Sequence, residues 1–322
     1  QNLVKKVSEL KSMNFFKGLG SYFDKVQRMR KIGGMVSDEL LISKEKVELS
    51  ASICKTDLTS DLVGEFPELQ GLMGGYFSEH QGFDKDISLA ISEQYLPIGL
   101  NSMVPKKPFS VALSITDKID TLVGFFGINE KPTSSKDPLA LRRIALGIIR
   151  TTIENKKNLK INDLLNYSSR LYDDQGYNLN NKDLQNELHN FLKDRFKYYL
   201  KEKEIRYDII EATLSSFSLN KLFSSFEKAK CLNKVINSQI GIDINSSFKR
   251  ASNILYHEMK NNEIEINDTT DPGIFKSDFE KNLYKKINDI KKYYSTINSD
   301  ENCEKSLSIL AETKKEVFEF FD

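Results

Sequence analysis

The fold is decided by the stretch Val111-Ala112-Leu113-Ser114-Ile115-Thr116-Asp117-Lys118-Ile119-Asp120-Thr121-Leu122-Val123-Gly124-Phe125-Phe126. Its apolar residues Ala112, Ile115, Ile119, Leu122 and Phe126 follow one another at spacings of 3, 4, 3 and 4 positions. Such spacing places the side chains on one face of an α-helix. The stretch therefore predicts a helix with a buried stripe.

The same helical periodicity recurs further along the chain. One stripe comes shortly after Pro138, a residue that suits a helix start, and another occupies residues 279–294. The members of the two stripes are Leu141, Ile144, Ile148 and Ile149, and Phe279, Leu283, Ile287, Ile290 and Tyr294. Strict alternation of apolar and polar residues, which indicates a strand, is scarce, and the best candidate is the short segment 263–267. We predict an all-α fold.

Composition sets the limits for function. The 322 residues suffice for about two domains. The net charge is only +1, so a nucleic-acid-binding role requires basic groups gathered on one face. Three scattered cysteines argue against a disulfide framework and favour a reducing compartment. No apolar run approaches the roughly 18 residues of a membrane span. The chain begins without Met, and we expect it to be a piece of a longer protein.

Loops and a shift in composition suggest the domain organisation. Residues 96–108 and 127–138 contain Pro, Gly, Ser and Thr and are expected to be connections. Residues 155–160 are polar and basic. We place a domain boundary there and predict one helical domain over residues 1–157 and a second over residues 158–322.

Two segments carry unusual residue combinations. The first is Val63-Gly64-Glu65-Phe66-Pro67-Glu68-Leu69-Gln70-Gly71. Glutamate does not bind phosphate, so Glu65, Glu68 and Gln70 either orient basic groups, or contact base and ribose edges, or cap and pack a helix start. The residues alone leave these roles open.

The second segment is Lys131-Pro132-Thr133-Ser134-Ser135-Lys136-Asp137-Pro138-Leu139-Ala140-Leu141-Arg142-Arg143. Its candidate phosphate contacts are Lys131, Lys136, Arg142 and Arg143, and Arg150 follows on the same helix face as Arg143. Guanidinium groups suit bidentate phosphate binding, and the amides at the start of the next helix could hold a phosphate as well. The alternative is a solvated basic loop whose arginines pair with Asp or Glu.

The second half offers further candidates for RNA contact. Lys249, Arg250 and Asn253 lie about 3 and 4 positions apart, which places them on one helix face, and Arg206 is a separate basic candidate. Basic groups can anchor phosphate while an amide reads an unstacked base and an aromatic such as Tyr256 stacks on it. The alternative is that Asn253 bonds the backbone and the aromatic residues belong to the core.

The carboxylates invite a comparison with metal sites. Asp57 and Asp61 on one segment and Asp117 and Asp120 on another could gather around a cation. The alternative is that Asp57 and Asp117 cap helices or pair with Lys55 and Lys118. His80, which we expect in a loop, is the only histidine in this half of the chain. Nucleophile elbows, phosphate loops and Cys-x-x-Cys pairs are also absent from the sequence. We therefore assign no catalytic residue and no metal ligand, and leave open whether Asp57 and Asp117 hold any metal.

These segments together resemble the β subunit of the bacterial-type, two-subunit glycyl-tRNA synthetase. The family strings Glu-Phe-Pro-Glu-Leu-Gln-Gly and Pro-Thr-Gly-Ser-x-Asp-Pro-Phe-Ala-Leu-Arg-Arg are matched, with Ser134 and Leu139 as departures, and the resemblance extends from residues 19–26 to residues 317–322. It implies an HD-like helical domain with a degenerate metal motif, in which residues 54–58 replace the His-Asp dyad and Gln94 replaces another histidine. A helical-bundle anticodon-binding domain, truncated at its C-terminus, would follow.

The resemblance also implies a function. The chain would be the tRNA-binding part of glycine–tRNA ligase and would recognise the acceptor arm and anticodon of tRNA-Gly. The α subunit would perform the glycine activation with ATP and Mg²⁺, so this chain would hold no cofactor. Its partners would be tRNA-Gly, the α subunit and a second β subunit in an α2β2 assembly, in the cytoplasm of a bacterium or in an organelle. The alternatives are an HD-type metal-dependent phosphohydrolase and a helical interaction module without an RNA role.

Overall fold

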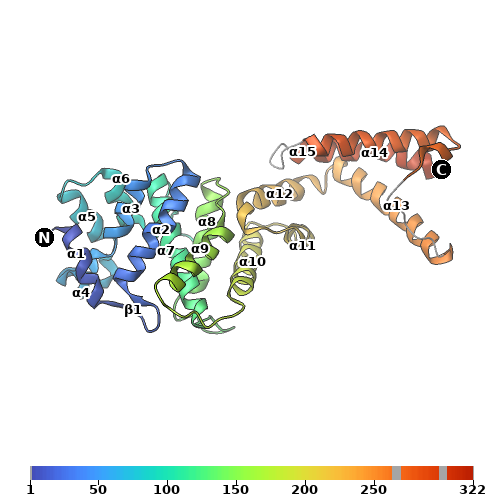
Figure 1. Ribbon diagram of the computed structural model, residues 1–322. Coiled ribbons are helices and arrows are strands. Elements are labelled where there is room, and N and C mark those ends of the chain that lie inside the picture. Colours follow the sequence, from blue (N-terminus) through green and yellow to red (C-terminus); the bar gives the residue numbers. More distant parts are fainter. Residues whose placement is uncertain (1, 263–269, 297–302, 322) are drawn as a thin grey trace. The chain divides into compact units, whose positions relative to one another are not determined.

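A computed structural model describes residues 2–262, 270–296 and 303–321 of the chain (Figure 1). These ranges are mostly helical, as predicted. They divide into two compact units, unit 1 with residues Gln1–Glu204 and Leu214–Phe226, and unit 2 with residues Ile205–Thr213 and Glu227–Asp322. None of the helices in the described ranges is long and apolar enough to cross a membrane.

Unit 1 contains ten complete α-helices among its described residues. They are α1 (Leu3–Lys6), α2 (Tyr22–Leu40), α3 (Lys44–Ile53), α4 (Asp61–Glu65), α5 (Leu72–His80), α6 (Lys85–Glu93), α7 (Pro108–Gly127), α8 (Leu141–Glu154), α9 (Ile161–Asp174) and α10 (Leu184–Glu202). Short 3-10 turns lie between them at η1 (Val7–Ser12), η2 (Thr56–Thr59), η3 (Pro67–Leu69) and η4 (Leu219–Lys221). The strands β1 (Asn14–Phe16) and β2 (Gly20–Ser21) form a small antiparallel pair.

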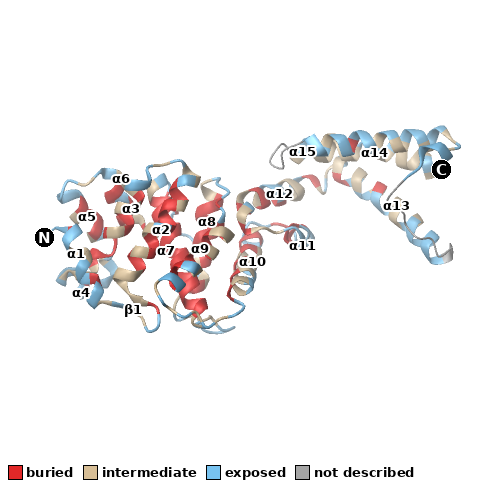
Figure 2. Cartoon of the chain, in the orientation of Figure 1, coloured by how far each residue is buried: buried red, intermediate tan, exposed pale blue. Residues whose placement is uncertain are grey.

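Helix α7 is the central element of unit 1, and it contains the stretch that decides the fold. Every residue from Ser110 to Gly127 is buried, and Figure 2 shows α7 almost wholly in the colour of buried residues. Helices α2, α6, α8 and α9 all pack against it. A helix that is covered on all sides must find partners for its polar side chains within the protein. The polar residues of α7 therefore define where charge collects inside unit 1.

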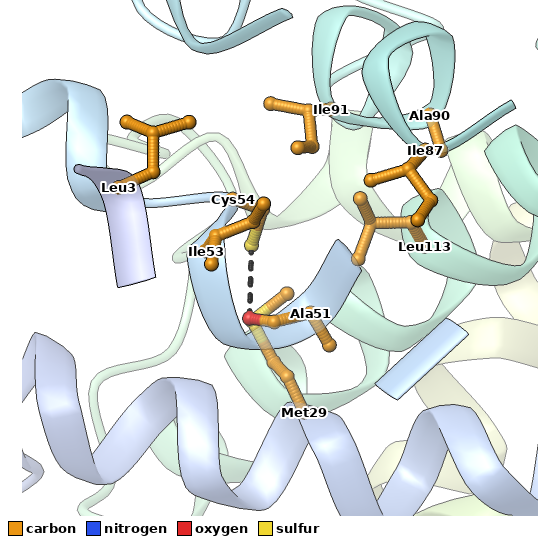
Figure 3. Packing of buried hydrophobic residues seen from close by; sticks show 9 residues of the cluster. All are labelled: Leu3, Met29, Ala51, Ile53, Cys54, Ile87, Ala90, Ile91 and Leu113. Carbon is orange, nitrogen blue, oxygen red and sulfur yellow. Dashed lines mark hydrogen bonds between the residues drawn. The ribbon is translucent and has the colours of Figure 1, made fainter. Parts of the chain in front are cut away.

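An apolar cluster beside α7 joins α2, α3 and α6 (Figure 3). Met29 of α2, Leu113 of α7 and Cys54, which follows α3, all contribute to it. The Cys54 thiol donates to the Ala51 carbonyl oxygen at 3.3 Å, and burial raises the pKa of this thiol to about 12. The cysteine thus behaves as a small core residue.

Unit 2 is built from helices that bury few of their residues. Its elements are α11 (Tyr207–Ser215) and α12 (Leu222–Val235), which each share residues with unit 1, and α13 (Gln239–Asn262), η5 (Pro272–Ile274), α14 (Asp278–Thr296), α15 (Cys303–Ala311) and α16 (Thr313–Phe321). Helix α16 packs against both α13 and α14. The stripe predicted over residues 279–294 is helical, but only its Ile290 is buried.

The structure confirms two of the predicted helices in unit 1 and differs from the sequence-based predictions at other points. The predicted helices at residues 111–126 and 141–149 are confirmed, although the second begins at Leu141, after Asp137 and Pro138. His80, expected in a loop, is the last residue of α5. The strand expected at residues 263–267 lies outside the described residues. Residues 158–204 belong to unit 1, so the compact units divide later in the chain than residue 157. The boundary at residue 157 concerns the domains of the family and stays a prediction.

Candidate functional site

The two unusual sequence segments meet at one cavity in unit 1. The cavity has a volume of about 800 Å³, and its wall includes Glu68 and Gln70 from the first segment and Ala140 and Arg143 from the second. The remaining wall comes from α2, α6, α7 and the residues around them. A volume of this size is typical of small-ligand sites. Neither segment alone predicts the cavity, because its wall combines residues about 70 positions apart in sequence.

Asp117 of α7 is the electrostatic centre of the cavity. Its Oδ1 atom lies 3.2 Å from Nζ of Lys25 and 3.0 Å from Nζ of Lys55. Burial pulls the pKa of Asp117 upward, but the neighbouring Lys25, Lys55 and Lys118 hold it far below its ordinary value. The carboxylate is therefore ionised across the neutral pH range. Pairing with Lys55 was one of the alternatives that the sequence offered, whereas the contact with Lys25 was not anticipated.

A second carboxylate lies one helical turn further along α7. Asp120 accepts hydrogen bonds from Nε of Arg28 at 2.6 Å and from Nζ of Lys25 at 3.1 Å. The Arg28 guanidinium also lies over the Tyr172 ring, 3.7 Å from its centroid. Both Arg28 and Asp120 are fully buried. This pair fixes α2 and α9 against α7 behind the cavity.

Lys55 is held on the cavity wall by two partners. Its ammonium group donates to the Tyr95 hydroxyl at 2.9 Å and lies 4.1 Å from the centroid of the Tyr95 ring. Burial opposes the charge of Lys55, yet Asp117 and Tyr95 raise the pKa of this lysine well above its ordinary value. An ammonium over an aromatic ring gains electrostatic attraction. Lys55 is thus a permanent buried cation.

Lys118 differs from the other two lysines because no carboxylate contacts its ammonium group in the described residues. Its Nζ atom donates to the Leu96 carbonyl at 2.7 Å and to the Ser114 hydroxyl at 2.8 Å. Burial lowers the pKa of Lys118 to about 7, reinforced by Lys55 and Lys25 and opposed by Asp117. Pairing of Lys118 with Asp117 was one of the sequence-based alternatives. In the structure Asp117 affects the pKa of Lys118 through electrostatic attraction without an ion-pair contact.

The cavity wall carries an excess of positive charge. Its basic residues are Lys25, Lys55, Lys118 and Arg143, and its acidic residues are Glu68 and Asp117. Four basic groups against two acidic groups leave +2 when Lys118 is protonated and +1 when it is neutral. Burying uncompensated charge is unfavourable. The arrangement therefore favours an anion in the cavity.

The first segment walls the cavity through the start of α5. Asp57 accepts hydrogen bonds at Oδ2 from the Gly71 amide at 2.5 Å and the Gly74 amide at 3.3 Å. Asp57 thus caps a helix, as one sequence-based alternative proposed. Gly71 has φ +81°, and a Cβ there would lie 3.0 Å from ring atoms of Tyr95. The residues Pro67 to Leu69 form the turn η3 that leads into this cap.

These contacts do not suit a metal of the HD type. The Lys25 and Lys55 ammonium groups contact the Asp117 carboxylate that would be a ligand. Gln94, at an expected histidine position, donates to the carbonyl oxygens of Cys54 and Ile91. Among the described residues no three His, Cys, Asp or Glu side chains lie close enough to hold a metal ion. The donor set fits an anion and repels a divalent cation.

In the second segment the start of α8 is already capped by a carboxylate. Asp137 accepts hydrogen bonds from the amides of Leu141 at 2.8 Å and Arg142 at 3.0 Å. These are the amides that the sequence suggested for a phosphate, so Asp137 takes that place. Arg142 is half-buried and donates to the Thr133 carbonyl of its own loop. Arg143 is exposed and lines the cavity.

The other predicted contacts in unit 1 have different surroundings. Lys136 is exposed, whereas Lys131 is half-buried and pairs with Glu187 at 2.5 Å. Arg150 is 9% exposed and donates to the carbonyl oxygens of Gly99, Leu100 and Ser102. Its Nε also binds Glu154. Arg150 therefore fixes the loop before α7, and its guanidinium is occupied by these protein groups.

Helix α13 of unit 2 presents a strip of exposed side chains. Lys249, Asn253 and Tyr256 follow at helical spacing of 4 and 3 and are all exposed, with Phe248 on the adjoining face 70% exposed. Arg250 is half-buried, and its guanidinium lies 4.6 Å from the centroid of the Phe318 ring of α16. We call residues 249, 253 and 256 the α13 strip. It combines a cation, an amide and an exposed aromatic ring.

Arg206 immediately precedes α11 and is exposed. Its guanidinium pairs with Asp208 at 2.9 Å and donates to the Asn237 side chain at 2.9 Å. Exposed pairs of this kind contribute little to stability. Arg206 therefore remains accessible while being oriented by its neighbours.

Comparison with known proteins relates the chain to one family. The family described as "Glycyl-tRNA synthetase beta subunit" matches residues 1–215. The chain is 36% identical, over 100% of its length, to the glycine–tRNA ligase beta subunit of Rickettsia canadensis (strain McKiel). It is 32% identical, over 97% of its length, to the protein of that name from Cereibacter sphaeroides. In both cases the chain spans about half, 45%, of the relative's length.

Proposed function

The chain belongs to the glycyl-tRNA synthetase beta subunit family, and from this premise we propose that it is the tRNA-binding part of glycine–tRNA ligase. Residues 1–157 and 158–322 would be the HD-like and anticodon-binding domains expected from the sequence. The chain would hold tRNA-Gly at its acceptor arm and its anticodon. Glycine activation with ATP and Mg²⁺ would take place on the α subunit, in an α2β2 assembly in the cytoplasm.

The observation that carries this proposal is the α13 strip. Sequence-specific proteins bind single-stranded RNA by stacking aromatic side chains on bases and contacting base edges with polar groups. Tyr256 is 65% exposed on a helix, although burying an aromatic ring is favourable. Lys249 lies two turns before it, where it can contact a phosphate, and Asn253 lies between them. This combination supports contact with the unpaired bases of an anticodon loop.

Unit 1 supports a second contact with RNA. Lys136 is exposed within one basic loop, and Arg143 is exposed in the first turn of α8, which follows this loop. Lys131 and Arg142 each have a protein partner, so we assign them to shaping this loop and only secondarily to phosphate contact. The loop would hold the backbone of the acceptor arm, because phosphate contacts position an RNA without reading its sequence.

The proposal is tested by measuring the affinity of the chain for tRNA-Gly and for a tRNA-Gly with an altered anticodon. We expect the altered tRNA to bind more weakly. We expect the Tyr256→Ala and Asn253→Ala variants to lose about 1–3 kcal/mol of binding, the usual value of one stacked or specifically bound base, and to discriminate less between the two tRNAs.

Lys285→Ala is the matched control for these variants, because Lys285 is an exposed lysine on α14, outside the α13 strip. It should bind both tRNAs as the unchanged chain does. Equal affinity of the unchanged chain for both tRNAs, together with unchanged binding by the Tyr256 and Asn253 variants, would contradict the anticodon assignment. Failure to bind any tRNA would contradict the proposed function.

A further inference from the structure

We propose that the cavity between the two sequence segments is a binding site for one nucleotide, with its phosphate held by the Lys55 side of the wall and by Arg143 at the rim. The nucleotide is either a single unpaired residue of an RNA or a free nucleoside monophosphate. Its identification as a nucleotide, beyond a phosphate-bearing anion, rests on the proposed function.

The charge of the cavity identifies the phosphate. Lys25, Lys55 and Lys118 are each at most 4% exposed, and Asp117 is the one buried acid among the lining residues. The Asp117 carboxylate contacts Lys25 and Lys55 and leaves Lys118 with only backbone and hydroxyl acceptors. An anion in the cavity would neutralise the surplus. Phosphate monoesters carry between −1.5 and −2 near pH 7. Because the pKa of Lys118 is about 7, the surplus of the wall lies between one and two positive charges near that pH, which a bound phosphate neutralises.

The shape and lining indicate the rest of the ligand. About 800 Å³ is more than a phosphate ion needs and is within the range of sites for small organic ligands. Phe15, Tyr22 and Tyr95 contribute aromatic surface to the wall, and Gln70 and Ser92 contribute hydrogen-bonding groups. Bases stack on aromatic rings and bind amide and hydroxyl groups. A volume of this size accommodates one nucleotide and excludes a duplex.

Both sequence segments acquire a common explanation from this site. The turn at Pro67 to Leu69 brings Glu68 and Gln70 to the cavity wall, and the Asp137-capped start of α8 brings Arg143 to the same wall. A purely structural role for these segments would not require a hollow between them. Glu68, at the exposed edge, is placed to accept from a ribose hydroxyl.

The experiment is calorimetric titration of the chain with nucleoside 5′-monophosphates, with the same nucleosides lacking phosphate, and with inorganic phosphate. We expect the monophosphates to bind at least tenfold more tightly than either of the other probes. Arg143→Ala should weaken monophosphate binding at least fivefold. Lys85→Ala removes an exposed lysine of α6 outside the cavity and should leave it unchanged.

Lys55→Met is the stronger test, because it removes a buried cation from the wall. Circular dichroism must first show that the Lys55→Met variant is folded. If this variant does not fold, Arg143→Ala still tests the proposal, because Arg143 is exposed and its replacement should not disturb the core. Nucleosides that bind as well as their monophosphates would overturn the proposal. So would inorganic phosphate that binds equally well, or monophosphate binding that neither variant changes.

Competition separates the two sources of the nucleotide and the two proposals. If a monophosphate displaces tRNA from the unchanged chain, the natural ligand is an RNA residue. If both bind independently, the natural ligand is a free nucleotide. Both results support the nucleotide site. Full tRNA binding without any monophosphate binding would overturn this inference alone. Monophosphate binding without any tRNA binding would overturn the proposed function and leave the site.

Discussion

Asp117 is the buried carboxylate through which the lysines of the cavity wall interact. It lies between two lysine ammonium groups inside the protein, where each charge depends on the others. Breaking one partner of a buried ion pair costs about 3–5 kcal/mol because it leaves an uncompensated charge. Asp117 therefore stabilises the fold only in combination with Lys25 and Lys55, and its charge limits how positive the cavity becomes.

Replacement of Asp117 by asparagine should lower the free energy of unfolding by about 3 kcal/mol or more at pH 7. The pKa of Asp117 is lower in the folded state than in the unfolded chain. Its contribution is therefore complete above about pH 4, the ordinary aspartate value, and is lost as the pH falls below it. Urea unfolding followed by circular dichroism between pH 7 and pH 2.5 measures both effects.

The Asp117→Asn variant should lose less stability than the unchanged chain on acidification. Asp61→Asn, at an exposed position in the first turn of α4, is the control and should change stability by less than about 0.5 kcal/mol. If the Asp117→Asn variant unfolds at the same urea concentration as the unchanged chain at every pH, the ion pairs contribute nothing to stability.

At the scale of elements, the start of α5 shows why the first segment has its particular residues. Gly71 has φ +81° and ψ −52°, a backbone conformation that L-residues adopt only under strain. Its amide binds the Asp57 carboxylate, and its missing Cβ leaves room for the Tyr95 ring. Tyr95 in turn holds Lys55. One glycine therefore connects a helix cap to the cavity wall.

Replacement of Gly71 by alanine should destabilise the chain by about 1–3 kcal/mol from backbone strain alone, with a further loss from contact with Tyr95. The measurement is urea unfolding at pH 7. Gly64→Ala in the same segment is a matched control, since Gly64 is helical and a Cβ there meets no atom within 4 Å. It should be neutral or stabilising by up to about 1 kcal/mol. Equal effects of both substitutions would contradict this interpretation of the segment.

Helix α13 illustrates a different relation between sequence and structure. Its helical spacing correctly placed Lys249 and Asn253 on a common face, but periodicity could not show which face α16 covers. Contact with Phe318 leaves Arg250 half-buried, while Tyr256 stays exposed. The candidate RNA surface is consequently shifted toward the α13 strip. The difference depends on a helix some fifty residues later in the chain.

For the whole molecule, the net charge of +1 means that binding to RNA must come from local groups. Lys136, Arg143 and Lys249 are the exposed cations of the proposed contacts. If each neutralises one phosphate, the slope of log affinity against log salt concentration should be about −2 to −3. Filter binding of tRNA-Gly between about 50 and 200 mM salt measures this slope. A slope near zero would contradict electrostatic binding by these residues.

Much of the molecule follows from local sequence patterns. The helices α7 and α8 and the loops around them could be predicted because apolar spacing and Pro or Gly punctuation are properties of neighbouring residues. The pairing of Asp117 with Lys55 and the capping role of Asp57 were among the alternatives that residue chemistry offered. The contacts of Arg150 were missed, because carbonyl oxygens of a distant loop leave no mark in a sequence.

The sequence by itself determined the helical character of the chain and its two identifying segments, since both depend on residues close together along the backbone. Only the tertiary structure decided that these segments line one cavity and that Lys25 of α2 joins Lys55 at Asp117. Lys55 and Tyr95 alone are 40 positions apart. The physical reason is that helix formation is a local process, whereas the placement of charges depends on how distant helices pack around α7.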